Sequence, residues 1–328
     1  MTTYYRGFLL YSLNRQPTFF HIRCFFMAKL KSKWFETPSS GFGYATKFYY
    51  KVFKSIAQDE TLSLNSELPP MKTTWFLTEK KMAAWLKLTG YDLPYPQAFT
   101  FSAPAGVWAL MQVLKEIGIS FGRIMHLSSR LLMLSKDGFQ VGEHYSTYVH
   151  YLGVKPHSKR AVMIRFLSIV KNVRGQDIMH LEDELYVAGL DEDFVKQLNL
   201  SSEETQRRNT KATLLNNKMA DSLKIDIGRS LGQQYGKLSG DLNPMHISSI
   251  GARLFGHKKS FIQGLCTLNV VVATLGKHWK CTIRSVDINF IRPVSQPSKP
   301  TLLCTLDHFE LIDDEGNLLV SGRYICSN

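Results

Sequence analysis

The chain has 328 residues, of which 44% are hydrophobic and 20% are charged. This length is enough for two domains of ordinary size, and the composition argues against extensive disorder. Forty lysines and arginines against 27 aspartates and glutamates give a net charge of +13. Such a balance favours anionic partners such as phosphate esters, an acidic protein, anionic lipid or nucleic acid, and the charge alone does not choose among them.

The five cysteines are odd in number and lack Cys-x-x-Cys spacing. They therefore indicate neither a disulfide framework nor a zinc or other metal site, and a protein of the reducing cytoplasm is expected. The sequence contains no dinucleotide-binding glycine pattern, no phosphate-binding loop and no nucleic-acid signature. We therefore expect neither a nucleotide cofactor nor a nucleic-acid partner.

Residues 1–70 are expected to form an N-terminal extension. Arginines interrupt every apolar run before Met27, so nothing there approaches the about twenty apolar residues of a membrane span. We hold as a hypothesis that Met27 is the true first residue. Between Phe42 and Ile56 apolar residues recur at helical spacing, which predicts an amphipathic helix that packs on its own domain. Contact of this helix with a membrane surface is the less favoured alternative.

Residues 71–200 are predicted to be the first folded unit. Thr78 should cap a helix that runs through Leu88 and ends at Gly90. A longer, buried helix is expected over about residues 105–117. Strands are expected after it, separated by turn signals such as Lys155-Pro156. The expected strands cover residues 123–134, 144–152, 161–173 and 177–188.

The polar stretch 201–222 is the expected linker, and residues 223–328 repeat the plan of the first unit. The elements expected in this second unit are a short strand over 223–227, a polar loop, a helix over 264–277 and strands over 282–290, 301–312 and 318–326. Asp313–Gly316 is a hairpin signal. A buried helix followed by antiparallel strands is the order of a hot-dog domain, in which a sheet wraps a central helix. Two copies predict an α+β tandem, or double, hot-dog.

The most informative stretch is residues 235–252, YGKLSGDLNPMHISSIGA. Asn243 before Pro244 predicts a helix N-cap followed by proline at the first helical position. On such a turn Asp241 and His246 can converge on one small volume, as a reaction with two proton-handling groups around one water requires. The alternative is that these polar residues only satisfy the turn locally, and residue types alone leave the two interpretations equally favoured.

The whole pattern decides between them. Tyr-x-x-x-Ser-Gly-Asp-x-Asn-Pro-x-His, followed by Ala252 and by Phe-Ile-Gln-Gly-Leu-Cys-Thr ending at Thr267, resembles the type 2, R-specific enoyl-CoA hydratases of the MaoC-like family. The resemblance is strong over residues 231–326, weaker over 42–200 and absent before that. The first unit lacks the motif. The resemblance to two-domain members therefore implies one active site per chain, with a degenerate first hot-dog that helps to shape the acyl-binding space.

The resemblance also implies roles for single residues. Asp241 and His246 would hold a water with help from Asn243, and we do not assign which of the pair removes the water proton. The backbone N–H of Gly264 would receive the thioester oxygen, where a helix N-terminus adds partial positive charge. The alternative for Gly264 is that it merely starts a helix.

Four further residues are expected to contact the substrate: Ser239, Gly240, Gln263 and Leu265. Gln263 departs from the family pattern, because most members carry histidine at this position. Glutamine donates hydrogen bonds but cannot carry a proton. If this position only orients the loop, activity survives; if it tunes the charge of the pocket, activity falls.

The expected activity is the interconversion of trans-2-enoyl and (R)-3-hydroxyacyl thioesters by addition or loss of water, with acyl-CoA of fatty-acid metabolism as substrate and with no cofactor. The first alternative is a dehydratase of acyl-carrier-protein thioesters in fatty-acid or polyketide synthesis, which would suit the basic charge. The second is a non-catalytic acyl-thioester-binding module, favoured by Gln263 and the degenerate first unit. A monomer with an internal pair of hot-dogs and a homodimer are both compatible with the sequence.

Overall fold

The computed structural model describes residues 33–34, 68–90, 124–197, 211–214 and 219–327. The strands in these residues are β1 (Lys33–Trp34), β2 (Met71–Phe76), β3 (Ile124–Met133), β4 (His144–Ser158), β5 (Ala161–Asn172), β6 (Asp177–Ala188), β7 (Asp221–Lys224), β8 (Thr282–Phe290), β9 (Thr301–Cys304), β10 (His308–Ile312) and β11 (Leu318–Ser327). The helices are α3 (Glu79–Thr89), α5 (Glu192–Gln197), α6 (Leu231–Ser239), α7 (Pro244–Ile247), α8 (Ser249–Leu254) and α9 (Gly264–Trp279).

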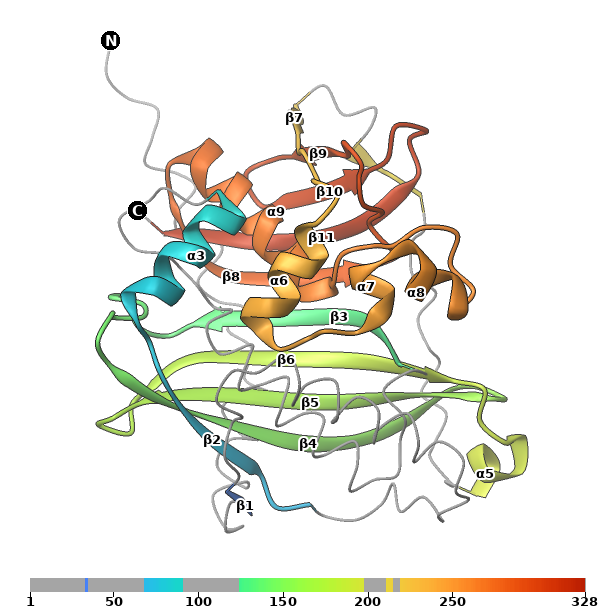
Figure 1. Ribbon diagram of the computed structural model, residues 1–328, viewed down its shortest axis with the longest axis horizontal. Helices are drawn as coiled ribbons and strands as arrows, with labels where there is room; N and C mark the ends of the chain where they lie inside the picture. Colours follow the sequence, from blue (N-terminus) through green and yellow to red (C-terminus); the bar gives the residue numbers. More distant parts are fainter. Residues whose placement is uncertain (1–32, 35–67, 91–123, 198–210, 215–218, 328) are drawn as a thin grey trace, which may run out of the picture.

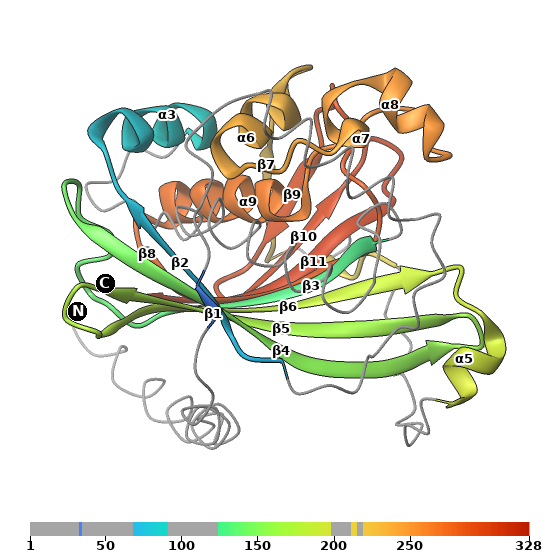
Figure 2. The ribbon, with the colours of Figure 1, turned by 60° about the horizontal axis from the view of Figure 1, so that its bottom comes forward.

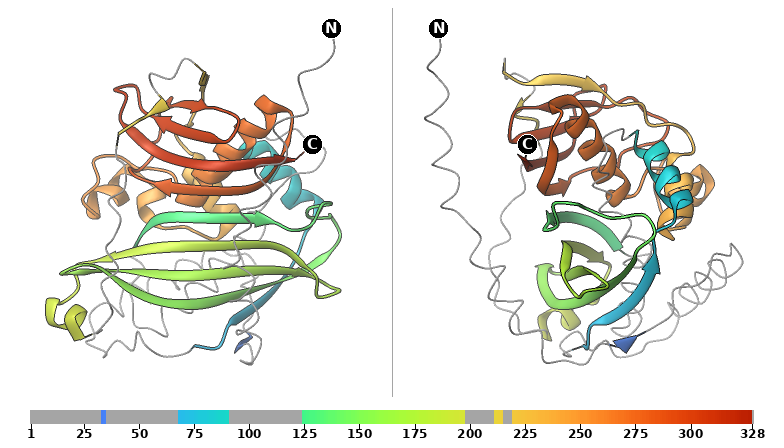
Figure 3. Two further views of the ribbon diagram at one scale, coloured as in Figure 1. Left: turned by 180° about the vertical axis from the view of Figure 1, so that it is seen from behind. Right: turned by 90° about the vertical axis from the view of Figure 1, so that its left-hand side faces the viewer.

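All the strands belong to one 11-stranded sheet in the order β1-β2-β4-β5-β6-β3-β8-β11-β10-β9-β7 (Figure 1). The two halves meet at β3, which pairs antiparallel with β6 of its own half and with β8 of the second half. The register across this junction aligns Ser129 with Ile288. Figure 3 shows the strands of the second half continuing the surface formed by those of the first half.

One long helix packs directly on this sheet. In Figure 2, α9 lies between the sheet and an outer layer that contains α3, α6, α7 and α8. Most of α9 is buried, without a break from Cys266 to Ala273, because the helix is apolar on nearly all sides. The hydrophobic core around it draws on both halves, including Leu131 of β3, Met179 of β6 and Val286 of β8. The described residues thus have the α+β arrangement expected from the sequence.

The local signals of the first half predict its elements well. Thr78 caps α3 by accepting a hydrogen bond from the backbone N–H of Lys81 at 3.2 Å, and Gly90 ends the helix with a left-handed φ of 68°. The predicted strands at 123–134, 161–173 and 177–188 correspond to β3, β5 and β6 within one residue at each end. The expected helices at 42–56 and 105–117 lie outside the described residues.

Two strand predictions need correction. Lys155-Pro156 does not end the strand expected over 144–152, because β4 continues to Ser158 through register shifts next to Gly153 and Pro156. Irregular pairing of this kind tolerates a residue that has no N–H to donate. The single strand expected over 301–312 is a hairpin of β9 and β10, since a turn at Thr305 interrupts it. Helix α6 was not predicted, whereas α8 contains Ala252, which was expected to lie in a helix.

The cysteines also differ from expectation. Cys281 and Cys326 form a disulfide between the start of β8 and the end of β11. The register of this antiparallel pair aligns Cys326 with Ile283, which brings the two cysteines together although they are 45 residues apart in sequence. Sequence spacing could not show this pairing. Among the described helices, none is both long and apolar enough to cross a bilayer.

A buried carboxylate anchors the described end of the linker to the sheet. Glu310 in β10 is 6% exposed, and its two oxygens accept hydrogen bonds from the backbone N–H groups of Thr213 and Leu214 and from the Thr213 hydroxyl, at 2.6 to 2.9 Å. Charged acceptors make the stronger class of hydrogen bond. Thr213 and Leu214 are therefore held at a defined point on β10. The expected domain boundaries at 200 and 223 stay predictions.

Replacing this carboxylate should loosen the linker and lower stability. We expect Glu310→Ala to lower the free energy of unfolding by about 2 to 4 kcal/mol, because it leaves two backbone N–H groups without their charged acceptor. Thermal and urea unfolding would measure the loss. Glu79→Gln, which changes an exposed glutamate in α3, is the control. An unfolding free energy equal to that of the wild type for Glu310→Ala would contradict this role of the carboxylate.

Candidate active site

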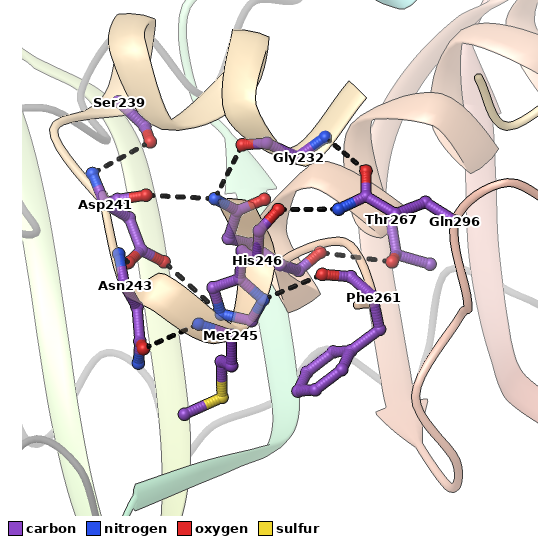
Figure 4. Close-up of polar contacts among 10 residues, drawn as sticks. Gly232, Ser239, Asp241, Asn243, Met245, His246, Phe261, Thr267 and Gln296 are labelled. Carbon is purple, nitrogen blue, oxygen red and sulfur yellow. Dashed lines mark hydrogen bonds and ion pairs between the residues drawn. The ribbon is translucent and has the colours of Figure 1, made fainter. Parts of the chain in front are cut away.

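A short loop between α6 and α7 carries the polar residues singled out in the sequence (Figure 4). Gly240 ends α6 with a left-handed φ of 80°, which turns the chain toward the sheet. Asn243 then begins α7, and its side-chain oxygen accepts a hydrogen bond from the backbone N–H of Met245 at 3.3 Å. The predicted N-cap followed by Pro244 is confirmed. Asp241 is held between these two caps.

His246 and Asp241 face each other across a gap. The Nδ1 atom of His246 lies 2.9 Å from the carbonyl oxygen of Phe261, so Nδ1 carries the proton in the neutral ring and donates it to that oxygen. The other ring nitrogen, Nε2, is 3.9 Å from Oδ2 of Asp241. This distance is too long for a direct hydrogen bond, and a water that bridges the two atoms fits it.

The surroundings keep the imidazole of His246 neutral. Burial lowers its pKa below the ordinary value of 6.5 and outweighs the Asp241 carboxylate and the hydrogen bond to Phe261, which both raise it. A neutral ring whose Nδ1 donates to a carbonyl leaves a lone pair on Nε2. That lone pair points to the side of Asp241, where it can accept a proton from a bound water.

Both residues line a cavity of about 570 Å³. Its volume lies within the range of about 300 to 1,000 Å³ that is common for small-molecule sites. Most of its wall is apolar, with Met245, Phe261, Leu265, Phe290 and Val294 among the lining residues. Strands β3 and β6 of the first half close one side of it. The cavity therefore lies between the two halves.

The N-terminus of α9 lines the same cavity. Gly264 is its first residue, and the N-cap Gln263 makes no side-chain capping bond. Within the described part of the chain, the backbone N–H of Gly264 has no hydrogen-bond acceptor. The first N–H groups of a helix lack intrahelical partners and carry partial positive charge, so this end of α9 can bind an oxygen that bears negative charge.

Gln263 supports the Asp241 loop through hydrogen bonds, and we call such a supporting side chain a strut. It is 3% exposed, and its Nε2 donates to the carbonyl oxygen of Gly232 at 3.1 Å and to that of Asp241 at 3.0 Å. The side chain thereby ties α6 and the Asp241 loop to the start of α9. These contacts favour the hypothesis that this position orients the loop.

A second strut was missed in the sequence. The side chain of Gln296 donates from Nε2 to the carbonyl oxygen of His246 at 2.6 Å and accepts from the backbone N–H of Gly232 at 2.8 Å. Gly232 has to be a glycine, since an added Cβ would lie 2.5 Å from the His246 carbonyl oxygen. No motif surrounds Gln296, so its sequence context gave no signal.

The expected site residues fall into two groups. Asp241, Asn243, His246, Gln263, Gly264 and Leu265 all line the cavity. Ser239 and Gly240 are not among the described lining residues. Ser239 is fully buried and accepts a hydrogen bond from the backbone N–H of Asp241 at 3.2 Å, while Gly240 caps α6. Ser239 and Gly240 therefore shape the loop. They were expected to contact the substrate, and the structure does not place them on the cavity wall.

The first half also brings polar groups to the cavity, which the sequence analysis did not predict. His126 of β3 and Asp183 of β6 line it, with Nε2 of His126 3.0 Å from Oδ1 of Asp183. The two residues are 57 positions apart and meet only because β3 pairs with β6. Local spacing carries no signal for such a pair.

The strut role of Gln263 can be tested with an isosteric change. Gln263→Glu replaces the donor Nε2 by a carboxylate oxygen that faces two carbonyl oxygens, so we expect stability to fall by about 1 to 3 kcal/mol. Turnover of an enoyl thioester should fall with it, because the Asp241 loop loses its support. Thermal unfolding and a hydration assay measure the two effects. The matched control is Gln234→Glu, at an exposed position of α6. A Gln263→Glu variant as stable and active as the control would rule out the strut.

Part of the chain matches a known protein family. Residues 210–312 match the family model described as "MaoC like domain". This segment contains the Asp241 loop, α9 and β8 to β10. No curated protein matches the chain in sequence.

Solved structures of similar fold cover most of the chain. HtdX of Mycobacterium tuberculosis is 14% identical, with 77% of this chain and 98% of that chain covered and a TM-score of 0.56. A MaoC-like dehydratase from Phytophthora capsici is 16% identical, with 81% and 97% covered and a TM-score of 0.58. A conserved hypothetical protein of M. tuberculosis described as having a double hotdog fold is 10% identical, with 77% and 93% covered and a TM-score of 0.51. At these identities the likeness shows the fold, and the predicted double hot-dog is confirmed.

Proposed function

Since residues 210–312 carry a MaoC-like domain in a double hot-dog fold, we propose that this protein is a hydro-lyase that interconverts trans-2-enoyl and (R)-3-hydroxyacyl thioesters. One observation carries the proposal. His246 Nε2 and Asp241 Oδ2 lie 3.9 Å apart on the wall of a cavity, where one water can bind to both. The amino end of α9 lines the same cavity and can receive the thioester oxygen.

The chemistry follows from these groups. Water bound between His246 and Asp241 gives a proton to the pair while its oxygen forms a bond to C3 of the enoyl thioester. The C2–C3 π electrons move toward the thioester oxygen, and the Gly264 N–H stabilises the resulting enolate. The proton then passes from the pair to C2. One water has been added, and both side chains regain their starting state.

The apolar wall suits an acyl chain, and the net charge of +13 suits an anionic carrier. We propose acyl-CoA as the substrate form, in fatty-acid metabolism in the cytoplasm. Acyl-carrier-protein thioesters are the alternative, which turnover with each carrier in turn would decide. Because one chain supplies both hot-dogs around the cavity, the proposal needs no second subunit at the site.

Neutralising Asp241 should abolish most of the turnover. With crotonyl-CoA as substrate, we expect Asp241→Asn to lower kcat by about 10² to 10⁴-fold, the usual contribution of a positioned acid or base. Loss of the enoyl-thioester ultraviolet absorbance measures the rate. Asp226→Asn, an exposed aspartate outside the cavity lining, is the matched control and should keep full activity.

The same assay separates an enzyme from a binding module. A wild-type protein that binds the thioester but does not hydrate it, with binding unchanged in Asp241→Asn, would identify a non-catalytic acyl-thioester-binding module. That outcome would end the enzymatic proposal.

The pH dependence should reflect the lowered pKa of His246. The reaction needs the neutral ring, and protonation at low pH removes the lone pair on Nε2. Because burial lowers the pKa of His246 below 6.5, the loss of kcat/KM that protonation of His246 causes should have its midpoint below pH 6.5. The apparent value belongs to the coupled pair. An acidic limb with a midpoint above 6.5 would contradict the neutral-imidazole mechanism.

A further inference from the structure

The first half places an imidazole directly against the start of α9. A Cβ built on Gly264 would lie 2.7 Å from Nδ1 of His126, and 3.1 and 3.2 Å from its Cγ and Cβ atoms. Both residues line the cavity. The histidine of β3 therefore occupies the space that any side chain at position 264 would need. This contact crosses from one hot-dog to the other.

The other ring nitrogen of His126 is already engaged. Its Nε2 lies 3.0 Å from Oδ1 of Asp183 and 2.9 Å from Oγ of Ser129, and the Ser129 hydroxyl donates to the same Oδ1 at 2.6 Å. The carboxylate can only accept, so Nε2 carries a hydrogen and donates to it. Asp183 is 8% exposed and Ser129 is 1% exposed. Two buried partners thus set the orientation of the ring.

This cluster is not arranged for nucleophilic catalysis. In a serine–histidine–aspartate triad the serine and the aspartate bind opposite nitrogens of the ring. Here Ser129 and Asp183 both contact Nε2, and the serine hydroxyl donates its hydrogen bond to the aspartate instead of to the imidazole. Because Nε2 is engaged, Nδ1 is the ring nitrogen that can contact a ligand. Within the described residues, Nδ1 of His126 has no hydrogen-bond partner.

A buried hydroxyl is a second, independent sign that a polar ligand atom binds in this cavity. Tyr235 of α6 is 1% exposed and lines the cavity, and its hydroxyl has no hydrogen-bond partner in the described part of the chain. Its electrostatic neighbours include Asp241 of the second half and Asp183 of the first half. A buried polar group normally has a partner. A substrate oxygen or a water that binds near both halves would supply one.

We propose that His126 is a catalytic residue of the thioester site: its Nδ1, in the protonated ring, donates a hydrogen bond to the thioester oxygen beside the backbone N–H of Gly264. The proposal rests on the hydration reaction proposed above and assigns part of that reaction to the first hot-dog. No bond to His126 forms or breaks. The negative charge that reaches the oxygen in the enolate meets two donors, one from each half.

The protonated ring is suited to this role because both of its nitrogens carry hydrogen. Nε2 keeps its bond to Asp183 while Nδ1 donates to the substrate, so the ring does not have to turn during the reaction. The Asp183 carboxylate balances the positive charge of the ring. Donors held in place before the reaction, in a site that excludes water, stabilise a developing oxyanion most effectively.

The position of His126 also explains why residue 264 is a glycine. A side chain there would displace the imidazole, since real Cβ atoms do not approach other atoms as closely as 2.7 Å. Glycine at this position is therefore required by His126, in addition to its place at the helix terminus. The two requirements can be separated by experiment, because removing the imidazole removes only the first.

A double-mutant cycle tests the contact. We expect His126→Ala to lower kcat for crotonyl-CoA about 10²-fold, the effect of one lost oxyanion donor, with KM changed only a few-fold. Gly264→Ala alone should cause a loss at least as large. In the His126→Ala background, however, Gly264→Ala should cost little more, because its clash has gone. Losses that multiply, or a kcat for His126→Ala close to that of the wild type, would overturn the proposal.

The matched control is His180→Ala. His180 of β6 is 6% exposed and its Nε2 lies 2.7 Å from Asp177, but it is not among the lining residues of the cavity. This change removes a histidine–aspartate pair of the same sheet in which the histidine is buried and the aspartate is half-buried. It should lower thermal stability without a selective loss of kcat. A kcat loss as large as that of His126→Ala would show a general effect of sheet damage and count against the proposal.

A binding measurement covers the case in which the alanine variants fold poorly. His126→Gln keeps a donor toward Asp183 and lacks Nδ1. Acetoacetyl-CoA forms an enolate with its own ultraviolet absorbance, so the fraction of bound enolate reports directly on donors to the oxyanion. We expect the wild-type protein to raise this fraction and His126→Gln to lose most of the increase. An unchanged enolate signal would contradict the role of Nδ1.

The outcomes separate this inference from the proposed function. If the wild type hydrates crotonyl-CoA, Asp241→Asn does not, and the His126 variants do so normally, the role of His126 falls and the proposed function stands. If the wild type does not hydrate enoyl thioesters at all, the proposed function falls. The enolate titration then decides whether His126 binds a thioester oxygen.

Discussion

The ladder between β3 and β8 is the interaction on which the site depends. It joins two halves of one chain into a continuous sheet, and it does so at the strands that border the cavity. His126 lies on β3 and Phe290 is the last residue of β8. The centroids of their rings are 4.7 Å apart. This pairing places His126 of the first half against Gly264 at the start of α9. The paired strands therefore place lining residues from both halves on the same cavity.

Contacts with backbone carbonyl oxygens do most of the positioning of Asp241 and His246, the proposed catalytic pair. The Phe261 carbonyl determines which nitrogen of His246 is available, and the amides of Gln263 and Gln296 hold the loop through carbonyl oxygens. Two glycines of α6 allow this close approach, since a Cβ at Gly232 or Gly236 would lie 2.5 Å from a carbonyl oxygen. Support of this kind holds a 3.9 Å gap between the buried His246 imidazole and the half-buried Asp241 carboxylate.

Local chemistry explains what the sequence could predict. Caps at Thr78 and Asn243, and the apolar helix that became α9, depend on neighbours within a few residues, and they were found where expected. The roles of Asp241 and His246 came from a family resemblance and not from composition. Helix α6 was missed because Gly232 and Gly236 lower its helix propensity. The same glycines are required by the close approach of the Asp241 loop, where a Cβ would meet a carbonyl oxygen. His126 with Asp183, and Cys281 with Cys326, meet only through strand register, so no local pattern could reveal them.

The most direct test of the central claim is a crystal structure of the wild-type protein with a bound (R)-3-hydroxyacyl thioester. The 3-hydroxyl oxygen is the former water oxygen, so it should lie within about 3 Å of both His246 Nε2 and an Asp241 carboxylate oxygen. The thioester oxygen should lie at the amino end of α9, on the Gly264 N–H. A ligand whose hydroxyl contacts neither side chain, or whose thioester oxygen points away from α9, would contradict the account.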